Sequence, residues 1–211
     1  MAALDRFDIE KVKQIFQESL HDDDDVLLDE YLKAYEEIIK FFNLMGTVFS
    51  FVSSDVRSKI DILYDFRSET DAERAEKFLT VKTMMTYEKE KDLLKDAKYI
   101  SGSRTLLRLH RGLEFIYEFL SRLASLTECD KTQLACKLAY EMTLAKHHPW
   151  VIRKGALVAM YALPTQGELL KRVCCNVARA VEVLPEMLNN TKLVYDRTEA
   201  LYTLYDLHHL P

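Results

Sequence analysis

Glycine and proline are scarce in this sequence, which holds 5 glycines and 4 prolines among 211 residues. Average usage is about 7% for glycine and about 5% for proline, so the chain carries roughly a third of the number expected. Tight hairpins and glycine-rich phosphate loops depend on these residues, which makes an all-β sandwich or a nucleotide-binding loop unexpected. A long disordered linker is equally unexpected. With 48% hydrophobic and 30% charged residues, the chain is predicted to be a helical globular protein.

Cysteines are few and the net charge is modest. The four cysteines form no CxxC pair, and we expect reduced structural thiols, no metal and no cofactor. The formal net charge of −5 gives no overall attraction to nucleic acid or to an anionic membrane, so an anionic ligand needs a local basic cluster. No apolar run approaches the ~20 residues that cross a bilayer, and the opening MAALDRFDIE has no signal-peptide core. We therefore expect a soluble cytosolic protein.

Apolar residues recur at helical spacing along nearly the whole chain and predict about eight helices and no strands. No internal repeat and no long linker divides the sequence, so residues 1–211 are predicted to form one domain. The aspartate run at 22–25 is expected to be a solvated turn whose carboxylates lie at the positive end of the next helix.

A few glycine, threonine and glutamate residues are expected to mark helix boundaries. Gly46 is expected to interrupt a long helix. Thr70 with Glu73, and Thr165 with Glu168, have the spacing of capping boxes and predict two helix starts.

Local signatures of enzymes are missing from the sequence. There is no GxSxG elbow, P-loop, GxGxxG or HExxH motif. His147 and His148 are adjacent, and neighbouring residues of a regular helix do not face one metal ion. Nothing in the sequence favours catalysis, and we expect the protein not to be an enzyme.

Two polar patterns remain. Asp55 and Lys59 are four residues apart and share one face of a helix; spacing alone favours a surface ion pair over a ligand site. Arg104, Arg108 and Arg111 form a stripe about 60° wide, opposite a leucine face. That stripe is either a solvated face or a phosphate site, since guanidiniums without acidic partners repel one another and their forks match phosphate oxygens.

A third pattern surrounds the only tryptophan of the chain. Trp150 follows a proline and precedes Arg153 and Lys154 in KHHPWVIRKG. Core packing is the ordinary role of tryptophan, but an indole beside cations at a helix start also suits a membrane interface.

The segments SDVRSK, RTLLRLHRGL and HHPW, with the turn ALPT, occur in the order seen in the glycolipid transfer protein superfamily. The chain resembles that superfamily over essentially its whole length. The resemblance implies an all-α, two-layer helical sandwich of about eight helices, enclosing a hydrophobic lipid pocket with a polar headgroup site at its mouth. It also implies a monomer that carries lipid between membranes and associates peripherally with Golgi, plasma or other membranes.

Two departures from the glycolipid-binding pattern point to a different headgroup. Glycolipid-binding members carry Asp, then Asn four residues later, then Lys three further on, whereas this chain has Asp55, Lys59 and Ile62. Their sugar-stacking Trp is replaced by Arg108. Two added cations suit a phosphate, and the pattern is similar to the ceramide-1-phosphate transfer branch, which includes plant accelerated-cell-death relatives.

The resemblance to this branch also implies roles for individual residues. Lys59, Arg104 and Arg108 would hold the phosphate, while Arg111 would orient Asp55 or add positive potential. Asp55 would accept hydrogen bonds from the sphingoid amide and hydroxyl, and His148 would donate to the acyl carbonyl. Expected membrane contacts are Trp150, Arg153 and Lys154, and expected pocket-lining residues are Phe49, Phe51, Val52 and Leu113.

The expected ligand is ceramide-1-phosphate or a similar phosphosphingolipid, and nucleic acid is not an expected partner. Two other functions stay open at this point. One is a sphingolipid-phosphate sensor or regulator that acts through a protein partner. The other is a glycolipid carrier, which Lys59 and Arg108 disfavour.

Overall fold

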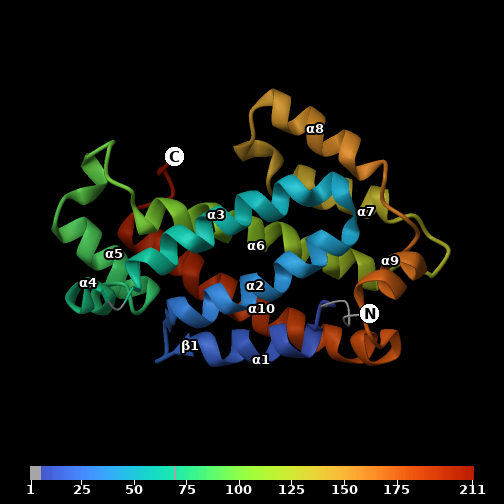
Figure 1. Ribbon diagram of the computed structural model, residues 1–211, viewed down its shortest axis with the longest axis horizontal. Helices are drawn as coiled ribbons and strands as arrows, with labels where there is room; N and C mark the ends of the chain where they lie inside the picture. Colours follow the sequence, from blue (N-terminus) through green and yellow to red (C-terminus); the bar gives the residue numbers. More distant parts are fainter. Residues whose placement is uncertain (1–5, 69) are drawn as a thin grey trace.

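The computed structural model describes residues 6–68 and 70–211, and nearly all of them belong to helices or to the short turns between helices (Figure 1). The elements, with η for a 3-10 helix, are α1 (Ile9–Ser19), β1 (Leu20–His21), β2 (Asp25–Val26), α2 (Leu28–Met45), η1 (Thr47–Phe49), α3 (Ser50–Phe66), α4 (Ala72–Lys77), α5 (Val81–Glu90), η2 (Leu93–Lys95), α6 (Gly102–Ala124), α7 (Thr132–Met142), η3 (Ala145–His147), α8 (Trp150–Met160), α9 (Gln166–Val173) and α10 (Val177–Tyr205). The all-α prediction is confirmed. The first half of MAALDRFDIE lies outside the described residues.

The long helices pack around α2 and α6. Helix α1 packs against α10 and α2, α10 packs against α6, and α3 packs against both α2 and α6. Figure 1 shows α1 and α10 along one side of the molecule, with α8 outermost on the opposite side. The buried apolar side chains of these helices form one connected core. Since α6 contacts both sides of the molecule, it positions the candidate site relative to that core.

The start of α6 is fixed by a buried carboxylate. Glu88 of α5 is fully buried and accepts hydrogen bonds from the backbone N–H groups of Gly102 and Ser103 and from the Ser101 hydroxyl. The Ser101 hydroxyl in turn accepts from the Arg104 N–H. A carboxylate and a serine cap at the positive end of a helix satisfy N–H groups that have no intrahelical partner.

The predicted helix starts are partly right. Gly46 ends α2 with a φ of +129°, where glycine is favoured, so the predicted interruption is confirmed. The capping box of Thr165 and Glu168 is also confirmed at α9. The box of Thr70 and Glu73 is wrong, because the Asp71 carboxylate caps α4 instead. Aspartate is a somewhat better N-cap than threonine.

The predictions of about eight helices and of no strands need correction. Within the described residues there are ten α-helices. Leu20 and His21 pair antiparallel with Asp25 and Val26 in a hairpin whose strands have two residues each. Residues 22–24 form its turn, and Asp25 begins β2.

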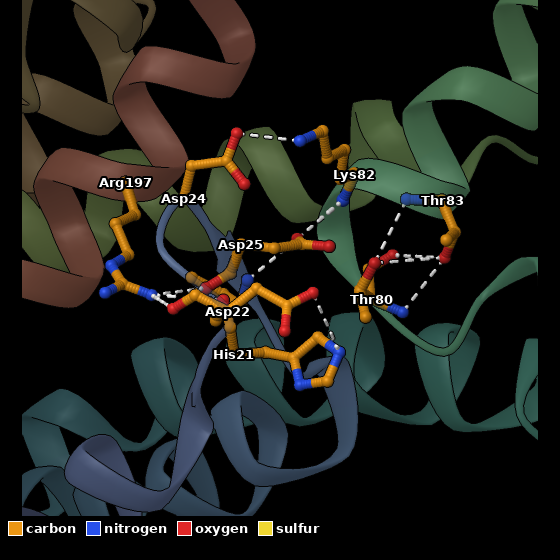
Figure 2. A network of polar contacts seen from close by, with 9 residues as sticks. His21, Asp22, Asp24, Asp25, Thr80, Lys82, Thr83 and Arg197 are labelled. Atoms are coloured by element: carbon orange, nitrogen blue, oxygen red, sulfur yellow. Dashed lines mark hydrogen bonds and ion pairs between the residues drawn. The ribbon is translucent and has the colours of Figure 1, made fainter.

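The hairpin is tied to two distant helices, as Figure 2 shows. Asp25 is 5% exposed, and its carboxylate accepts from the Lys82 N–H at 3.0 Å. Asp24 forms an ion pair with the Lys82 ammonium at 2.7 Å. The Arg197 guanidinium of α10 donates to three carbonyls of the hairpin. The expectation of a solvated turn is therefore wrong for Asp25, which is buried at the start of α5 rather than of the next helix, α2.

Candidate functional site

A cavity of about 650 Å³ lies between α2, α3, α6, α7 and α8. Its volume is within the roughly 300–1,000 Å³ that is typical of ligand pockets. Most of its lining is apolar, and Phe49, Phe51 and Val52 are part of it. Its charged and imidazole side chains are Asp55, Lys59, Arg108, Arg111, His147 and His148. An apolar chamber with a few convergent polar groups suits an amphipathic ligand.

The structure corrects the prediction that Leu113 lines the cavity. Its side chain is fully buried in the core and is not part of the cavity wall. On α6 the wall is made by residues such as Arg108, Gly112 and Ile116. Leu109, one turn earlier on the same face of α6, does contribute to the wall.

Asp55 and Lys59 form both an ion pair and a part of the cavity wall. The Lys59 ammonium lies 2.6 Å from a carboxylate oxygen of Asp55. Asp55 has 67% of its side chain exposed, whereas Lys59 has 12%. The pair therefore places an exposed acceptor and a mostly covered cation next to each other on α3.

Arg108 is the cation with the fewest contacts at this site. It lines the cavity and is exposed. Within residues 6–68 and 70–211, no hydrogen bond or ion pair engages its guanidinium. A charge left without a counterion at the mouth of an apolar cavity is suited to an anionic ligand group.

Arg111 is bound to the C-terminal segment. Its guanidinium donates to the carbonyls of His208 at 3.2 Å and Leu210 at 3.4 Å. Burial lowers its pKa, and the nearby charge of Arg108 acts in the same direction. In the part of the chain that the structure describes, its hydrogen bonds go to this segment and not to Asp55. An added positive potential is the role that this placement leaves to it.

Arg104 lies outside the cavity lining. It is on the same face of α6 as Arg108 but one turn nearer the start of the helix. Its guanidinium donates to the carbonyls of Leu94, Asp96 and Tyr99. These acceptors are neutral, so its charge is not compensated by a carboxylate. Its predicted role at the phosphate stays a prediction.

His148 is held by a hydrogen bond from the cavity wall. Its Nδ1 lies 2.9 Å from the Tyr140 hydroxyl. Burial lowers the pKa of His148, and the Asp55 carboxylate opposes that shift. A neutral imidazole that accepts at Nδ1 carries its proton on Nε2. This arrangement leaves one N–H donor for a ligand.

Much of the cavity wall was not predicted. Tyr140 and His147 line the cavity, for example, and so does Pro211. Tyr140 lies on an apolar helix without a distinguishing pattern. Pro211 reaches the site because the chain turns back after α10 at Asp206, which has a positive φ of 55°. No local pattern signals that return.

The surface beside the cavity is apolar and basic. Trp150 is 64% exposed, and the Lys154 ammonium lies 5.8 Å from the centroid of its ring. Val151, Val158 and Tyr161 are also exposed, and Ile152 of the same helix lines the cavity. Arg153 is exposed as well. Clustered exposed apolar side chains of this kind are typical of contact with a membrane or a partner.

Among the described residues, no helix has the length and hydropathy that spanning a membrane requires. Nor do the His, Cys, Asp and Glu side chains of these residues form a group of three or more that is placed to hold a metal ion.

Known proteins share both the sequence pattern and the fold of this chain. The family model described as Glycolipid transfer protein (GLTP) matches residues 26–175, more than half of the chain. The chain belongs to the glycolipid transfer protein family. The resemblance noted in the sequence is thereby confirmed.

Relatives within the family cover the whole length of the chain. The ceramide-1-phosphate transfer protein of Danio rerio is 40% identical over 98% of this chain and 99% of its own. The apo form of the mouse ceramide-1-phosphate transfer protein superposes with a TM-score of 0.89 at 36% identity, covering 97% of this chain and 100% of that one.

The human ceramide-1-phosphate transfer protein in complex with 2:0 ceramide-1-phosphate superposes with a TM-score of 0.87 at 33% identity, covering 98% of this chain and 100% of that one. The two-layer helical sandwich expected from the resemblance is confirmed by these structures.

Proposed function

We propose that this protein carries ceramide-1-phosphate from one membrane to another as a single domain that binds one lipid and breaks no bond. The phosphate lies at the polar end of the cavity, and the hydrocarbon chains fill its apolar part. The observation that carries the proposal is the exposed Arg108, which has no hydrogen-bond or ion-pair partner among the described residues, beside Lys59 at the wall of a mostly apolar cavity. The names of the relatives described above support the choice of lipid.

Charge selects the headgroup. A phosphate monoester carries about −1.5 to −2 charges at neutral pH, and each hydrogen bond to a charged group contributes about 1.5–3 kcal/mol. Lys59 and Arg108 hold the phosphate directly. Arg104 joins them by exchanging its carbonyl acceptors for phosphate oxygens. A neutral sugar or a bare hydroxyl gains far less from three cations, so this site favours the phosphate.

The amide of the lipid is recognised by one hydrogen-bond acceptor, Asp55, and one hydrogen-bond donor, His148. The exposed Asp55 carboxylate accepts from the sphingoid N–H and hydroxyl. His148, with its proton on Nε2, donates to the acyl carbonyl. A glycerolipid has no amide N–H to offer Asp55, so this pair selects a sphingolipid backbone.

The cavity replaces the bilayer for the hydrocarbon chains. Each buried CH₂ contributes about 0.8 kcal/mol, so a chain of ~16 carbons represents roughly 12 kcal/mol. Since the donor membrane and the cavity are both apolar, this large term nearly cancels during transfer. Binding is then reversible, and the headgroup decides which lipid is carried.

The exposed patch around Trp150 brings the cavity to a membrane. Its apolar side chains enter the interface while Arg153 and Lys154 lie against anionic headgroups. The net charge of −5 keeps the rest of the surface from adsorbing. We place the protein in the cytosol, with transient peripheral binding to Golgi, plasma or other membranes.

The proposal is tested by vesicle-to-vesicle transfer of fluorescent lipids. The wild-type protein is compared on ceramide-1-phosphate, phosphatidic acid and a glycosylceramide in otherwise identical vesicles. Fastest transfer of ceramide-1-phosphate is expected, because phosphatidic acid lacks the amide and the glycosylceramide lacks the phosphate. Activity on the glycosylceramide alone would contradict the proposal.

A further inference from the structure

Ile116 separates two voids in the interior. One is the cavity of about 650 Å³ described above. The other is a small void of about 10 Å³ further along α6, between α1, α2, α6 and α10. Ile116 is the residue that contributes to both walls. Its side chain is 6% exposed and belongs to the buried core.

The small void has an apolar wall. Phe16, Phe41 and Leu120 are among the side chains around it, and Thr191 brings the one hydroxyl. That hydroxyl already donates to the Met187 carbonyl at 2.8 Å. A buried water needs two to four polar partners and about 10–15 Å³ of probe volume, so a wall of this chemistry holds none. The void is therefore space that a hydrocarbon group is suited to fill.

The position of Ile116 along α6 places it about two turns beyond Arg108. It follows Arg108 by eight residues, which is about 12 Å at 1.5 Å per residue. Cavity-lining residues occur on α6 over this whole distance, from Arg108 through Gly112 to Ile116. A lipid whose phosphate lies at Arg108 directs the ends of its chains toward Ile116.

The rest of the partition contains aromatic rings that contact one another. On α2, Phe42 lines the cavity and Phe41 lines the small void, with their ring centroids 5.8 Å apart. Phe41 also packs against Phe119, and Phe119 stacks on Phe115. Among the described residues, Ile116 is the one that lines both voids.

We propose that Ile116 sets the longest hydrocarbon chain that the cavity accepts, and that the void behind it is the space into which the cavity extends. This inference rests on the proposed function, because it concerns the lipid carried at that site. Shortening Ile116 joins the two voids and admits the end of a longer chain. Enlarging Ile116 fills the far end of the cavity and excludes the end of a longer chain.

The test measures transfer of ceramide-1-phosphate species that differ only in the length of a saturated acyl chain. Ile116→Ala is expected to shift the optimum to longer chains, by up to about fourfold in relative rate for each methylene newly buried. Ile116→Val is expected to shift it in the same direction by less, and Ile116→Phe to shift it to shorter chains. Each variant is compared with the wild type for helix content and thermal unfolding.

Leu120→Ala is the matched control. Leu120 lies one turn further along α6 and lines the small void without reaching the cavity. Its truncation enlarges that void but leaves Ile116 in place, so the length profile is expected to stay that of the wild type. A shift in Leu120→Ala equal to that in Ile116→Ala would overturn the proposal.

The remaining outcomes separate this inference from the proposed function. If the wild type transfers ceramide-1-phosphate but the folded Ile116 variants keep its length profile, the role of Ile116 is wrong and the proposed function stands. If Ile116→Ala does not fold, opposite shifts in Ile116→Val and Ile116→Phe still support the proposal, and unchanged profiles overturn it. A wild type that transfers no ceramide-1-phosphate overturns the proposed function and this inference together.

Discussion

The Tyr140 hydroxyl lies 2.9 Å from Nδ1 of His148 and fixes the orientation of that imidazole at the cavity wall. With its pKa lowered by burial, His148 is neutral at pH 7, and when the Tyr140 hydroxyl donates to Nδ1 the remaining proton lies on Nε2. A single hydroxyl from α7 thereby prepares the donor assigned to the acyl carbonyl.

Tyr140→Phe is predicted to slow ceramide-1-phosphate transfer by about fivefold, which corresponds to the free energy of one lost hydrogen bond. The ring still packs in the wall, but Nδ1 of His148 loses its partner and the tautomer is no longer fixed. Transfer rates at equal protein concentration measure the effect. Tyr117→Phe on α6, outside the cavity lining, is the control, and an equal loss there would contradict the assignment.

Glu88→Ala is predicted to lower the free energy of unfolding by about 2–4 kcal/mol. The substitution removes the carboxylate that accepts from Ser101, Gly102 and Ser103, and it leaves these buried donors at the start of α6 without a partner. Denaturant unfolding provides the measurement. The nearby exposed Glu90 gives the comparison, since Glu90→Ala is expected to change stability by less than about 0.5 kcal/mol.

Stability is predicted to fall as the pH drops below about 6.5. Burial lowers the pKa of His110. As the pH falls, His110 is therefore protonated at a higher pH in the unfolded chain than in the folded one. Its hydrogen bond to Glu199, at 2.7 Å, lowers the pKa of that carboxyl. The stabilisation from Glu199 is therefore present above about 4.5 and is lost as the pH falls through its lower folded pKa.

Unfolding free energies between about pH 4 and 8 test this dependence. The variant His110→Phe is expected to flatten the curve just below about 6.5, where the buried histidine titrates. A wild-type stability that rises as the pH falls from about 7 to 5 would contradict the sign.

Trp150→Ala is predicted to weaken binding to anionic vesicles by about tenfold or more, the effect of leaving one large apolar side chain unburied. Co-sedimentation with vesicles measures the partition coefficient. Leu204→Ala on α10 removes a side chain of similar exposure, 67% against 64%, away from the cavity. Unchanged partitioning of Trp150→Ala would mean that this patch does not contact the membrane.

A feature of the fold is predictable from the sequence when the residues that form it are close together along the chain. The register of α6 and the start of α9 follow from periodicity and from a Thr–Glu pair three residues apart, so they are predictable. Asp25 is different, because its partners Lys82 and Arg197 lie on α5 and α10. No pattern within the aspartate run identifies those distant groups.

The same limit applies to the candidate site. Lys59 and Arg108 are recognisable because they depart from the glycolipid-binding pattern at positions that line the cavity. The carbonyl partners of Arg104 and Arg111 are not recognisable from the sequence, since every residue has a backbone oxygen whatever its type. The burial of Leu113 depends on the rotation of α6 between two layers, which apolar periodicity alone does not specify.

The central claim is that an unpartnered arginine at the cavity selects the phosphate. It is tested most directly by the ceramide-1-phosphate transfer rate of Arg108→Leu, compared with Arg179→Leu, which removes a surface arginine paired with Glu10. We predict that Arg108→Leu abolishes transfer while its helix content and unfolding temperature match the wild type, and that Arg179→Leu stays active. Wild-type transfer by a correctly folded Arg108→Leu would contradict the account.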